Sequence, residues 1–292
     1  MGFVVENAWV NQAKIHFMNI SIKSVCPGVY EIRELGFVSS YLVTGTNLSV
    51  MIDTGFGVFN TFELIRPYVS GDVLVVNTHV HPDHSNGNRY FPVTSMGKKE
   101  WQNHGMKWNR STPNILKGTW DPGAIFRLTG LNDRLPQGFN PEDYNKFVAK
   151  GLPDPNYLWA DGDVIDLGSN SIQIFDTPAH TSGSISLLEK NNGIFFVGDA
   201  FAKNAPWYLH LKCRPGLEDT FNTFRLMAGL ADKVKAIYPA HGDKGMEGAY
   251  LQWLGKKMQA IETGEIKGHE LDHRTGKAVY FDIGGYGPYM PL

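Results

Sequence analysis

The chain has 292 residues, of which 42% are hydrophobic and 19% are charged, so it can bury a core and wholesale disorder is excluded. A formal net charge of −2 gives no overall positive field that would attract nucleic acid or an anionic membrane. Glycine is enriched, with 32 residues, which indicates many tight turns and close backbone approaches.

Strands mixed with helices are predicted in two sections of the chain. The first section begins with four short strands at 20–25, 28–34, 39–45 and 48–53 and a helix at 58–69. A nearly continuous apolar strand follows at 72–78, then a short helix at 85–90, a strand at 92–95 and a helix at 97–104. The second section begins with four strands at 164–167, 171–177, 184–190 and 193–199. A helix at 218–232, a strand at 235–242 and a long helix at 245–262 follow.

Between the two sections, residues 105–160 are rich in aromatic residues, proline and glycine and have weak periodicity. A stretch of this length without clear elements is typical of a functional insertion. Its aromatic side chains, with others further along the chain, predict a mostly apolar substrate pocket formed by Trp108, Trp120, Trp207, Tyr208 and His210. A covered sheet edge or a homodimer contact explains the same aromatic residues equally well.

Targeting and redox signals are absent from the sequence. The N-terminus lacks the cationic and apolar blocks of a secretory signal, and no run reaches the roughly 18 apolar residues of a membrane span. Cys26 and Cys213 are far apart and match neither a disulfide framework nor a zinc knot. We therefore expect a cytoplasmic protein with no membrane partner.

The segment Thr78–His84, THVHPDH, carries the strongest chemical signal and directly follows the apolar strand. In an extended chain, residues two apart point the same way, so His79 and His81 can bind one ion together. Asp83 and His84 follow the bend at Pro82 and can serve a neighbouring ion. Four such side chains within six residues predict two adjacent metal ions.

Three further candidate ligands each follow a predicted strand. His180 follows the strand at 171–177, Asp199 ends the strand at 193–199, and His241 lies at the end of the strand at 235–242. Strand ends provide rigid anchors, and the small neighbouring residues allow the backbone to approach a compact site.

Together these motifs resemble the metallo-β-lactamase superfamily. HVHPDH at 79–84, His180 in TPAHTSGS, Asp199 in VGDA and His241 in PAHG match its metal-binding motifs in order. Asp53 in MIDTG matches the aspartate that supports the site without binding metal. The resemblance implies an α+β fold, a four-layer αββα sandwich, formed by a single domain of residues 1–292. The core would span about 20–265, with the insertion at about 105–160 and a C-terminal tail at about 266–292.

The resemblance also implies the ligand set of two zinc ions. His79, His81 and His180 would bind the first ion. Asp83, His84 and His241 would bind the second, with Asp199 bridging the two. Imidazole and carboxylate ligands without thiolate suit Zn²⁺, while Fe or Mn is compatible with the same ligands.

The implied activity is a dinuclear zinc-type hydrolase, in which hydroxide bridging two ions cleaves a small-molecule ester, lactone or thioester. Asp83 would be catalytic as the acceptor of the water proton. Alternatives are a mononuclear iron oxidoreductase of the persulfide dioxygenase type, and a phosphodiesterase or β-lactamase of the same fold. Asp rather than Cys at position 199 weakens the β-lactamase alternative, and Lys256 and Lys257 are interpreted as surface residues rather than a glutathione site.

Overall fold

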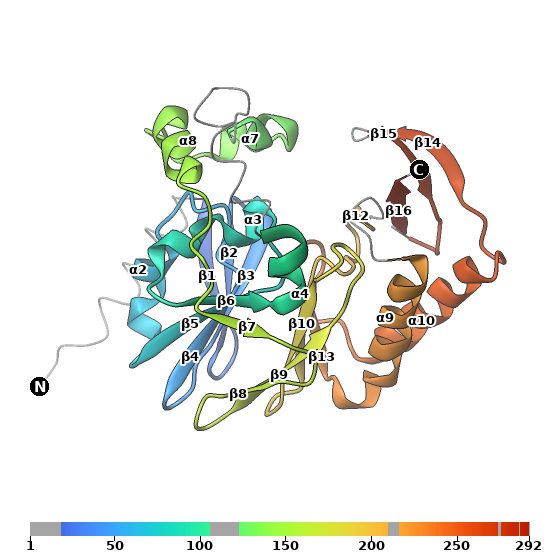
Figure 1. Cartoon of the computed structure of the whole chain (residues 1–292), viewed down its shortest axis with the longest axis horizontal. Coiled ribbons are helices and arrows are strands. Elements are labelled where there is room, and N and C mark those ends of the chain that lie inside the picture. Colours follow the sequence, from blue (N-terminus) through green and yellow to red (C-terminus); the bar gives the residue numbers. More distant parts are fainter. Residues whose placement is uncertain (1–18, 106–122, 210–215, 274–275, 286, 292) are drawn as a thin grey trace, which may run out of the picture. The chain divides into compact units, whose positions relative to one another are not determined.

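The computed structural model describes residues 19–105, 123–209, 216–273, 276–285 and 287–291 (Figure 1). The chain divides into two compact units. Unit 1 comprises residues 1–95 and 104–156, and unit 2 comprises residues 96–103 and 157–292. Trp108, Trp120, His210 and Cys213 lie outside the described residues.

Unit 1 is built on a mixed sheet, coloured blue to cyan in Figure 1. Its strands lie in chain order, with antiparallel pairs up to β4 and a parallel β4–β5 pair. They are β1 (Ile20–Cys26), β2 (Val29–Glu34), β3 (Val38–Val43), β4 (Leu48–Ile52) and β5 (Asp72–Asn77), followed by β6 (Thr94–Gly97), which carries the chain into unit 2. These strands agree with the sequence prediction. In β5 every residue after Asp72 is buried, as expected for a nearly continuous apolar strand.

The helices of unit 1 are shorter than predicted. The helix expected at 58–69 is α2 (Thr61–Ile65), which tightens into the 3₁₀ turn η1 (Arg66–Tyr68). Asn60 caps its start by accepting a hydrogen bond from the Glu63 amide at 3.3 Å, and Pro67, which has no amide hydrogen, lies in the tightened turn. The helix expected at 85–90 begins earlier, as α3 (Pro82–Ser85) and then η2 (Asn86–Tyr90), because proline is well placed at the first helical position.

The described part of the insertion contains helices that periodicity alone does not predict. They are α7 (Ala124–Leu128), η4 (Asn132–Arg134) and α8 (Pro141–Ala149). An aromatic cluster anchors them, since the Phe126 ring lies 5.3 Å from Phe56, 5.6 Å from Phe139 and 5.2 Å from Tyr144 between centroids. Phe56 is remote in sequence from the other three rings. The start of α8 does have a local signal that the sequence analysis missed, because Asn140 caps the helix and Pro141 occupies its first position.

Unit 2 contains a five-stranded mixed sheet with the order β13-β11-β10-β9-β8. Only the β11–β13 pair in this sheet is parallel among the described strands. The bounds are β8 (Val164–Asp166), β9 (Ser171–Asp176), β10 (Ile185–Glu189), β11 (Ile194–Gly198) and β13 (Ala236–Pro239). Each was predicted from the sequence. The unit also includes α4 (Lys98–Glu100), which continues into the π-helical turn η3 (Trp101–Gly105), and β7 (Tyr157–Trp159).

Two long helices of unit 2 pack side by side, as Figure 1 shows in orange. They are α9 (Leu217–Gly229) and α10 (Ala249–Glu262), with η6 (Ala231–Lys233) after α9. Their buried faces join the strand side chains in one core that includes Phe195, Phe224 and Leu251. A Cβ at Gly255 would lie 2.8 Å from the Ala228 Cβ, so this glycine permits the close approach of the helices.

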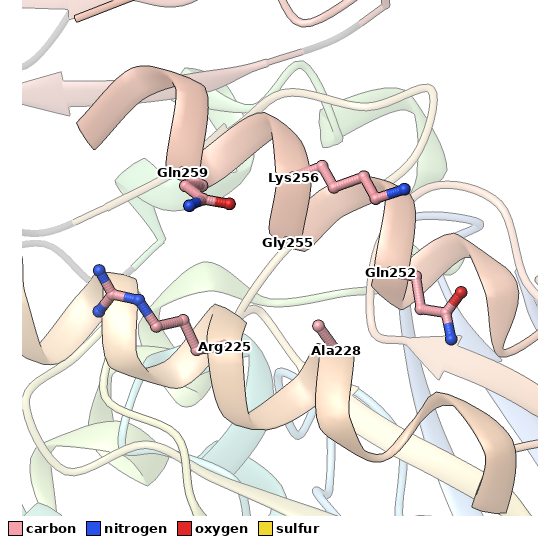
Figure 2. A pocket seen from close by; sticks show the side chains of 6 residues that line it. All are labelled: Arg225, Ala228, Gln252, Gly255, Lys256 and Gln259. Carbon is pink, nitrogen blue, oxygen red and sulfur yellow. The ribbon is translucent and has the colours of Figure 1, made fainter. Parts of the chain in front are cut away.

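On their solvent side these helices enclose a surface hollow (Figure 2), lined by Arg225, Ala228, Gln252, Gly255, Lys256 and Gln259. Arg225 is engaged there, since it donates to Asn222 at 2.7 Å and forms an ion pair with Glu262. Lys256 is exposed, in agreement with the surface role expected for it.

The segment expected to be a C-terminal tail forms a second sheet of unit 2. Its order is β12-β16-β15-β14, with β12 (Trp207–Tyr208), β14 (His269–His273), β15 (Gly276–Tyr280) and β16 (Pro288–Pro291). Short strands with little hydrophobic alternation give no clear sequence signal. The β12–β16 pair also joins segments that are remote in sequence. Within the described residues, no helix is both long and apolar enough to cross a membrane.

Candidate metal centre

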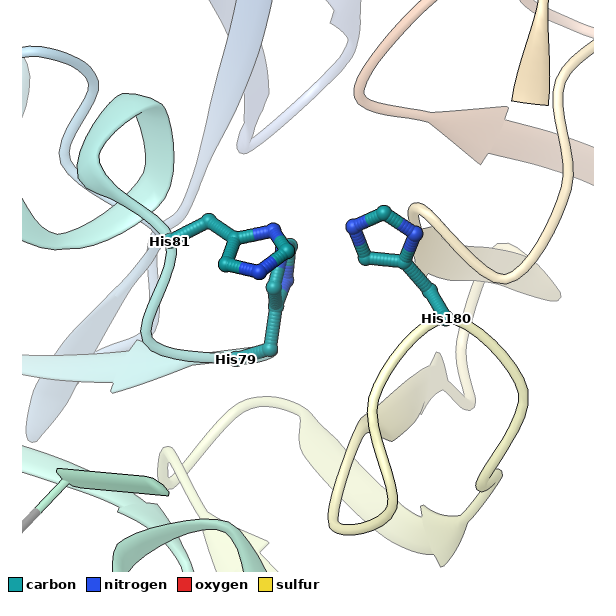
Figure 3. A group of neighbouring side chains, drawn as sticks. All are labelled: His79, His81 and His180. Carbon is teal, nitrogen blue, oxygen red and sulfur yellow. The ribbon is translucent and has the colours of Figure 1, made fainter. Parts of the chain in front are cut away.

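The loop after β5 presents the candidate ligands of unit 1. The His79 ring centroid lies 4.6 Å from that of His81 and 4.0 Å from that of His84. Ligand atoms of His79 lie within 4.8 Å of ligand atoms of His81 and His84. A ligand atom of Asp83 also lies within 4.8 Å of one of His84. Figure 3 shows His79 and His81 extending from this loop, and also draws His180 of unit 2.

A buried aspartate at the end of β4 organises this loop. Asp53 is 2% exposed, and its Oδ1 accepts a hydrogen bond from the Thr78 amide at 2.8 Å. Its Oδ2 accepts from the Thr78 hydroxyl at 2.8 Å and lies 2.8 Å from His84 Nδ1. Asp53 thus holds the start of the loop and one candidate ligand, while its own oxygens are occupied by these contacts.

These contacts also determine which ring nitrogens face a metal. Because Asp53 accepts at His84 Nδ1, that nitrogen carries the proton and Nε2 is the ligand atom. The Thr78 hydroxyl donates its proton to Asp53, so it accepts from His79 Nδ1 at 3.1 Å. His79 therefore also presents Nε2.

Asp83, the predicted proton acceptor, is more accessible than His79 and His84, which are both buried. Its side chain is 18% exposed, and Oδ2 lies 3.6 Å from His84 Nε2. Two ligand atoms at this separation can both reach one ion, as the Asp83–His84 pairing requires.

Glu34 braces the turn between β4 and α2, a role the sequence does not reveal. Its carboxylate accepts hydrogen bonds from the amides of Phe56 at 2.6 Å, Val58 at 3.0 Å and Phe59 at 3.4 Å. Burial raises the pKa of Glu34 to about 7, although the three amide bonds oppose the rise. Gly55 has φ +74° and a Cβ there would collide with the Glu34 carboxylate, so this position requires glycine.

The insertion contacts the loops that carry these residues. The buried Tyr144 hydroxyl donates to the Phe56 carbonyl oxygen at 3.0 Å and accepts from Asn86 Nδ2 at 3.1 Å. Burial raises the pKa of Tyr144 far above its ordinary value, so the phenol stays protonated. The described half of the insertion is therefore anchored beside the candidate ligands of unit 1.

In unit 2, three strand ends bring His180, Asp199 and His241 together. His180 follows β9, Asp199 follows β11 and His241 follows β13. His180 Nε2 lies 3.5 Å from Asp199 Oδ2, and His241 Nε2 lies 3.6 Å from Asp199 Oδ1. Each histidine faces a different oxygen of Asp199, which is the arrangement a bridging carboxylate needs.

Contacts behind His180 fix its orientation. Its Nδ1 lies 2.7 Å from the Tyr208 carbonyl oxygen, so Nδ1 donates there and Nε2 is the ligand atom. The next residue, Thr181, donates its hydroxyl proton to the fully buried Glu100 at 2.7 Å. Glu100 was not predicted, because an acidic residue beside two lysines at the start of a helix resembles a surface residue.

The two described residues of the predicted pocket differ in position. Trp207 is 3% exposed and belongs to the core of unit 2, with ring contacts to Phe201 and Phe224. Strand alternation points it inward, and its place in a substrate pocket remains a prediction. Tyr208 points to the opposite face and is half-buried.

The donor chemistry of both units fits a divalent metal. The seven candidate ligands are imidazoles and carboxylates without thiolate, a set suited to Zn²⁺ and compatible with Fe or Mn. A family model described as the metallo-beta-lactamase superfamily matches residues 33–108 and 117–241. The chain belongs to this superfamily. Membership supports the expected class, a metal-dependent hydrolase.

Several known proteins are about a quarter identical in sequence to this chain. Acyl-coenzyme A thioesterase MBLAC2 of Homo sapiens is 27% identical over 242 residues, covering 75% of this chain and 80% of that protein. The Bos taurus protein of the same name is 27% identical over 240 residues, with the same coverage. The probable metallo-hydrolase MJ0888 of Methanocaldococcus jannaschii is 25% identical over 229 residues, covering 74% of this chain and 94% of that protein.

Solved structures confirm the expected α+β metallo-β-lactamase fold. The family protein TTHA1429 of Thermus thermophilus has a TM-score of 0.56 and 16% identity, covering 83% of each chain. A metallo-beta-lactamase from Pontibacter korlensis has a TM-score of 0.55 and 16% identity, covering 82% of this chain and 99% of that one.

Proposed function

We propose that this chain is a metal-dependent hydrolase that cleaves a small-molecule acyl thioester. The observation that carries the proposal is the set of seven ligand-type side chains gathered after strand ends in each unit. Hydrogen bonds already orient the rings of His79, His84 and His180. The acyl-coenzyme A thioesterases among the relatives favour a thioester over the ester and lactone that the motifs also allow.

The proposal assigns two ions to the ligands. His79, His81 and His180 would hold the first ion, Asp83, His84 and His241 would hold the second, and Asp199 would contribute its carboxylate to both. Two bound divalent ions supply a water of lowered pKa and polarise the thioester carbonyl.

The side chains of this chain prepare that chemistry. Asp53 and Thr78 hold His79 and His84 in the tautomer that offers Nε2, which avoids a proton loss during metal binding. Asp83 has an accessible carboxylate and accepts the proton of the attacking water. Without a fixed acceptor, the proton would have to leave through solvent.

A substrate panel with metal analysis tests this function. We expect about two metal ions per chain, and the highest kcat/KM for an acyl thioester among thioester, ester, lactone, β-lactam and phosphodiester substrates. His81→Ala removes a proposed ligand and should lower turnover by more than about 100-fold, with reduced metal content and a retained fold. Lys190→Ala, at an exposed position directly after β10, is the control and should keep full activity.

Different results would contradict the proposal. One Fe per chain with oxygen uptake would indicate a persulfide dioxygenase-type enzyme. Preferred cleavage of bis-p-nitrophenyl phosphate would indicate a phosphodiesterase, and preferred cleavage of a β-lactam would indicate a β-lactamase. Unchanged activity of the His81→Ala variant would refute the site assignment.

A further inference from the structure

The short strand β12 supplies the backbone group that orients His180. The carbonyl oxygen of Tyr208 accepts the Nδ1 proton of His180 at 2.7 Å. The His180 Nε2 then faces Asp199 at 3.5 Å. A shift of this carbonyl would release the ring to rotate or to adopt the other tautomer, with Nε2 protonated and unable to bind a metal.

The C-terminal strand β16 holds β12 in place. The two strands pair in parallel, with Tyr208 opposite Tyr289, and the Leu209 amide donates to the Tyr289 carbonyl oxygen at 2.9 Å. β12 has two residues and lies at the end of the sheet order, next to β16. A strand this short depends on its partner for its position.

Three tyrosines in register reinforce the pairing. The Tyr289 ring lies 5.3 Å from Tyr208 and 4.8 Å from Tyr280 between centroids. Tyr280 faces Tyr289 across the β15–β16 pair, so the three rings form a continuous row across three strands. Cross-strand aromatic pairs of this kind stabilise strand register.

The opposite face of the same sheet is fixed in the core of unit 2. Trp207 of β12 and Met290 of β16 both belong to that core. β16 lies beyond residue 241, where the match to the family model ends. The sheet is therefore an addition, anchored in the core of unit 2, that connects the C-terminal segment to Tyr208, whose carbonyl contacts His180.

We propose that the C-terminal sheet positions His180 for metal binding, and that Tyr289 is the positioning residue through which it acts. Tyr289 fixes β12, and β12 fixes the carbonyl that selects the His180 tautomer. The inference rests on the proposed function only in taking His180 as a metal ligand.

The test uses the full-length chain with Tyr289→Val and Tyr280→Val, which remove ring contacts but retain strand-favouring side chains. Long-range ¹H–¹⁵N spectra of the metal-free protein report which ring nitrogen of His180 is protonated. Titration with Zn²⁺ reports affinity. For Tyr289→Val we expect loss of the single His180 tautomer and a roughly 10–100-fold rise in the zinc Kd, with a smaller rise for Tyr280→Val. Tyr289→Phe should restore the original values.

Two controls separate positioning from general destabilisation. The His84 tautomer, held by Asp53 in unit 1, should not change in any of these variants. Tyr157→Val, at an exposed tyrosine of β7, should leave the zinc Kd unchanged.

An unaltered His180 tautomer in Tyr289→Val, or equal weakening of zinc binding in Tyr157→Val, would overturn the inference. If Tyr289→Val fails to fold, Tyr280→Val decides by the same criteria. Absence of thioesterase activity in the unsubstituted chain would refute the proposed function alone, because the tautomer is measured without metal or substrate.

Discussion

A single buried carboxylate, Asp53, connects two candidate metal ligands at the residue scale. It accepts both hydrogen-bond donors of Thr78 and faces His84 Nδ1, and Thr78 in turn contacts His79. Asp53 has φ +58°, a left-handed conformation that Asp and Asn adopt more readily than most residues. The backbone thus favours Asp or Asn at this position, and the hydrogen bonds favour Asp.

Asp53→Asn tests this role with little change in shape or backbone preference. The new amide group places donors against the Thr78 hydroxyl or the Thr78 amide, and one acceptor is lost. We expect the zinc Kd to rise about 10–100-fold in calorimetric titrations, with an unchanged circular dichroism spectrum. Asp72→Asn, at the exposed start of β5, is the control and should bind zinc normally. Normal affinity of Asp53→Asn would remove the supporting role assigned to this residue.

At the element scale, the turn between β4 and α2 depends on a group in a neighbouring strand. Glu34 in β2 accepts three amide hydrogens of that turn, and Tyr144 of α8 bonds to the Phe56 carbonyl oxygen in the same turn. Elements from two other parts of the sequence thus fix the segment that follows Asp53. The geometry of the turn depends on their packing as well as on its own Gly55.

The raised pKa of Glu34 predicts a pH dependence of stability. Because its pKa of about 7 exceeds the ordinary 4.5, the folded chain keeps a proton that the unfolded chain releases over this interval. The contribution of Glu34 to the free energy of unfolding is therefore full below about pH 4.5 and decreases as the pH rises to about 7, by up to about 3 kcal/mol. Urea unfolding at several pH values measures the free energy of unfolding of the unsubstituted chain and of Glu34→Gln. The difference between the two free energies should show this decrease.

The control for this experiment is Glu63→Gln, at an exposed position of α2. The free energy of unfolding of this variant should differ from that of the unsubstituted chain by an amount that does not vary with pH in the same interval. A constant difference for Glu34→Gln as well would show that Glu34 has an ordinary pKa.

At the scale of the whole molecule, the candidate ligands are divided between the units. Unit 1 contributes His79, His81, Asp83 and His84, and unit 2 contributes His180, Asp199 and His241. The family match spans residues in both units. The proposed function assigns ligands from each unit to the same ion, which makes the two sets dependent on each other.

A double substitution tests this dependence. If His81 and His180 bind the same ion, His81→Ala and His180→Ala should each reduce the metal content from about two ions to about one. The double variant should then resemble each single variant, because the second substitution removes a ligand of an ion already lost. Metal analysis after dialysis measures this, and additive losses in the double variant would indicate separate sites.

The sequence by itself determined most strands, the two long helices and the identity of the candidate ligands. These features have local signals: apolar runs at strands such as β5 and β11, helical spacing in α10, and a dense HVHPDH motif. The α+β fold followed from them through the resemblance to a known superfamily. The single-domain organisation and the cytoplasmic location remain predictions.

Only the tertiary structure showed what holds the ligands in place. Glu34, Glu100 and the Tyr208 carbonyl act on residues far from them in sequence, and Trp207 belongs to the core of unit 2. The C-terminal sheet was also missed, because its strands are short and because β16 pairs with β12, which lies more than 60 residues before it. Ligand types are written locally in the sequence, whereas ring orientation depends on contacts that exist only after distant segments have packed.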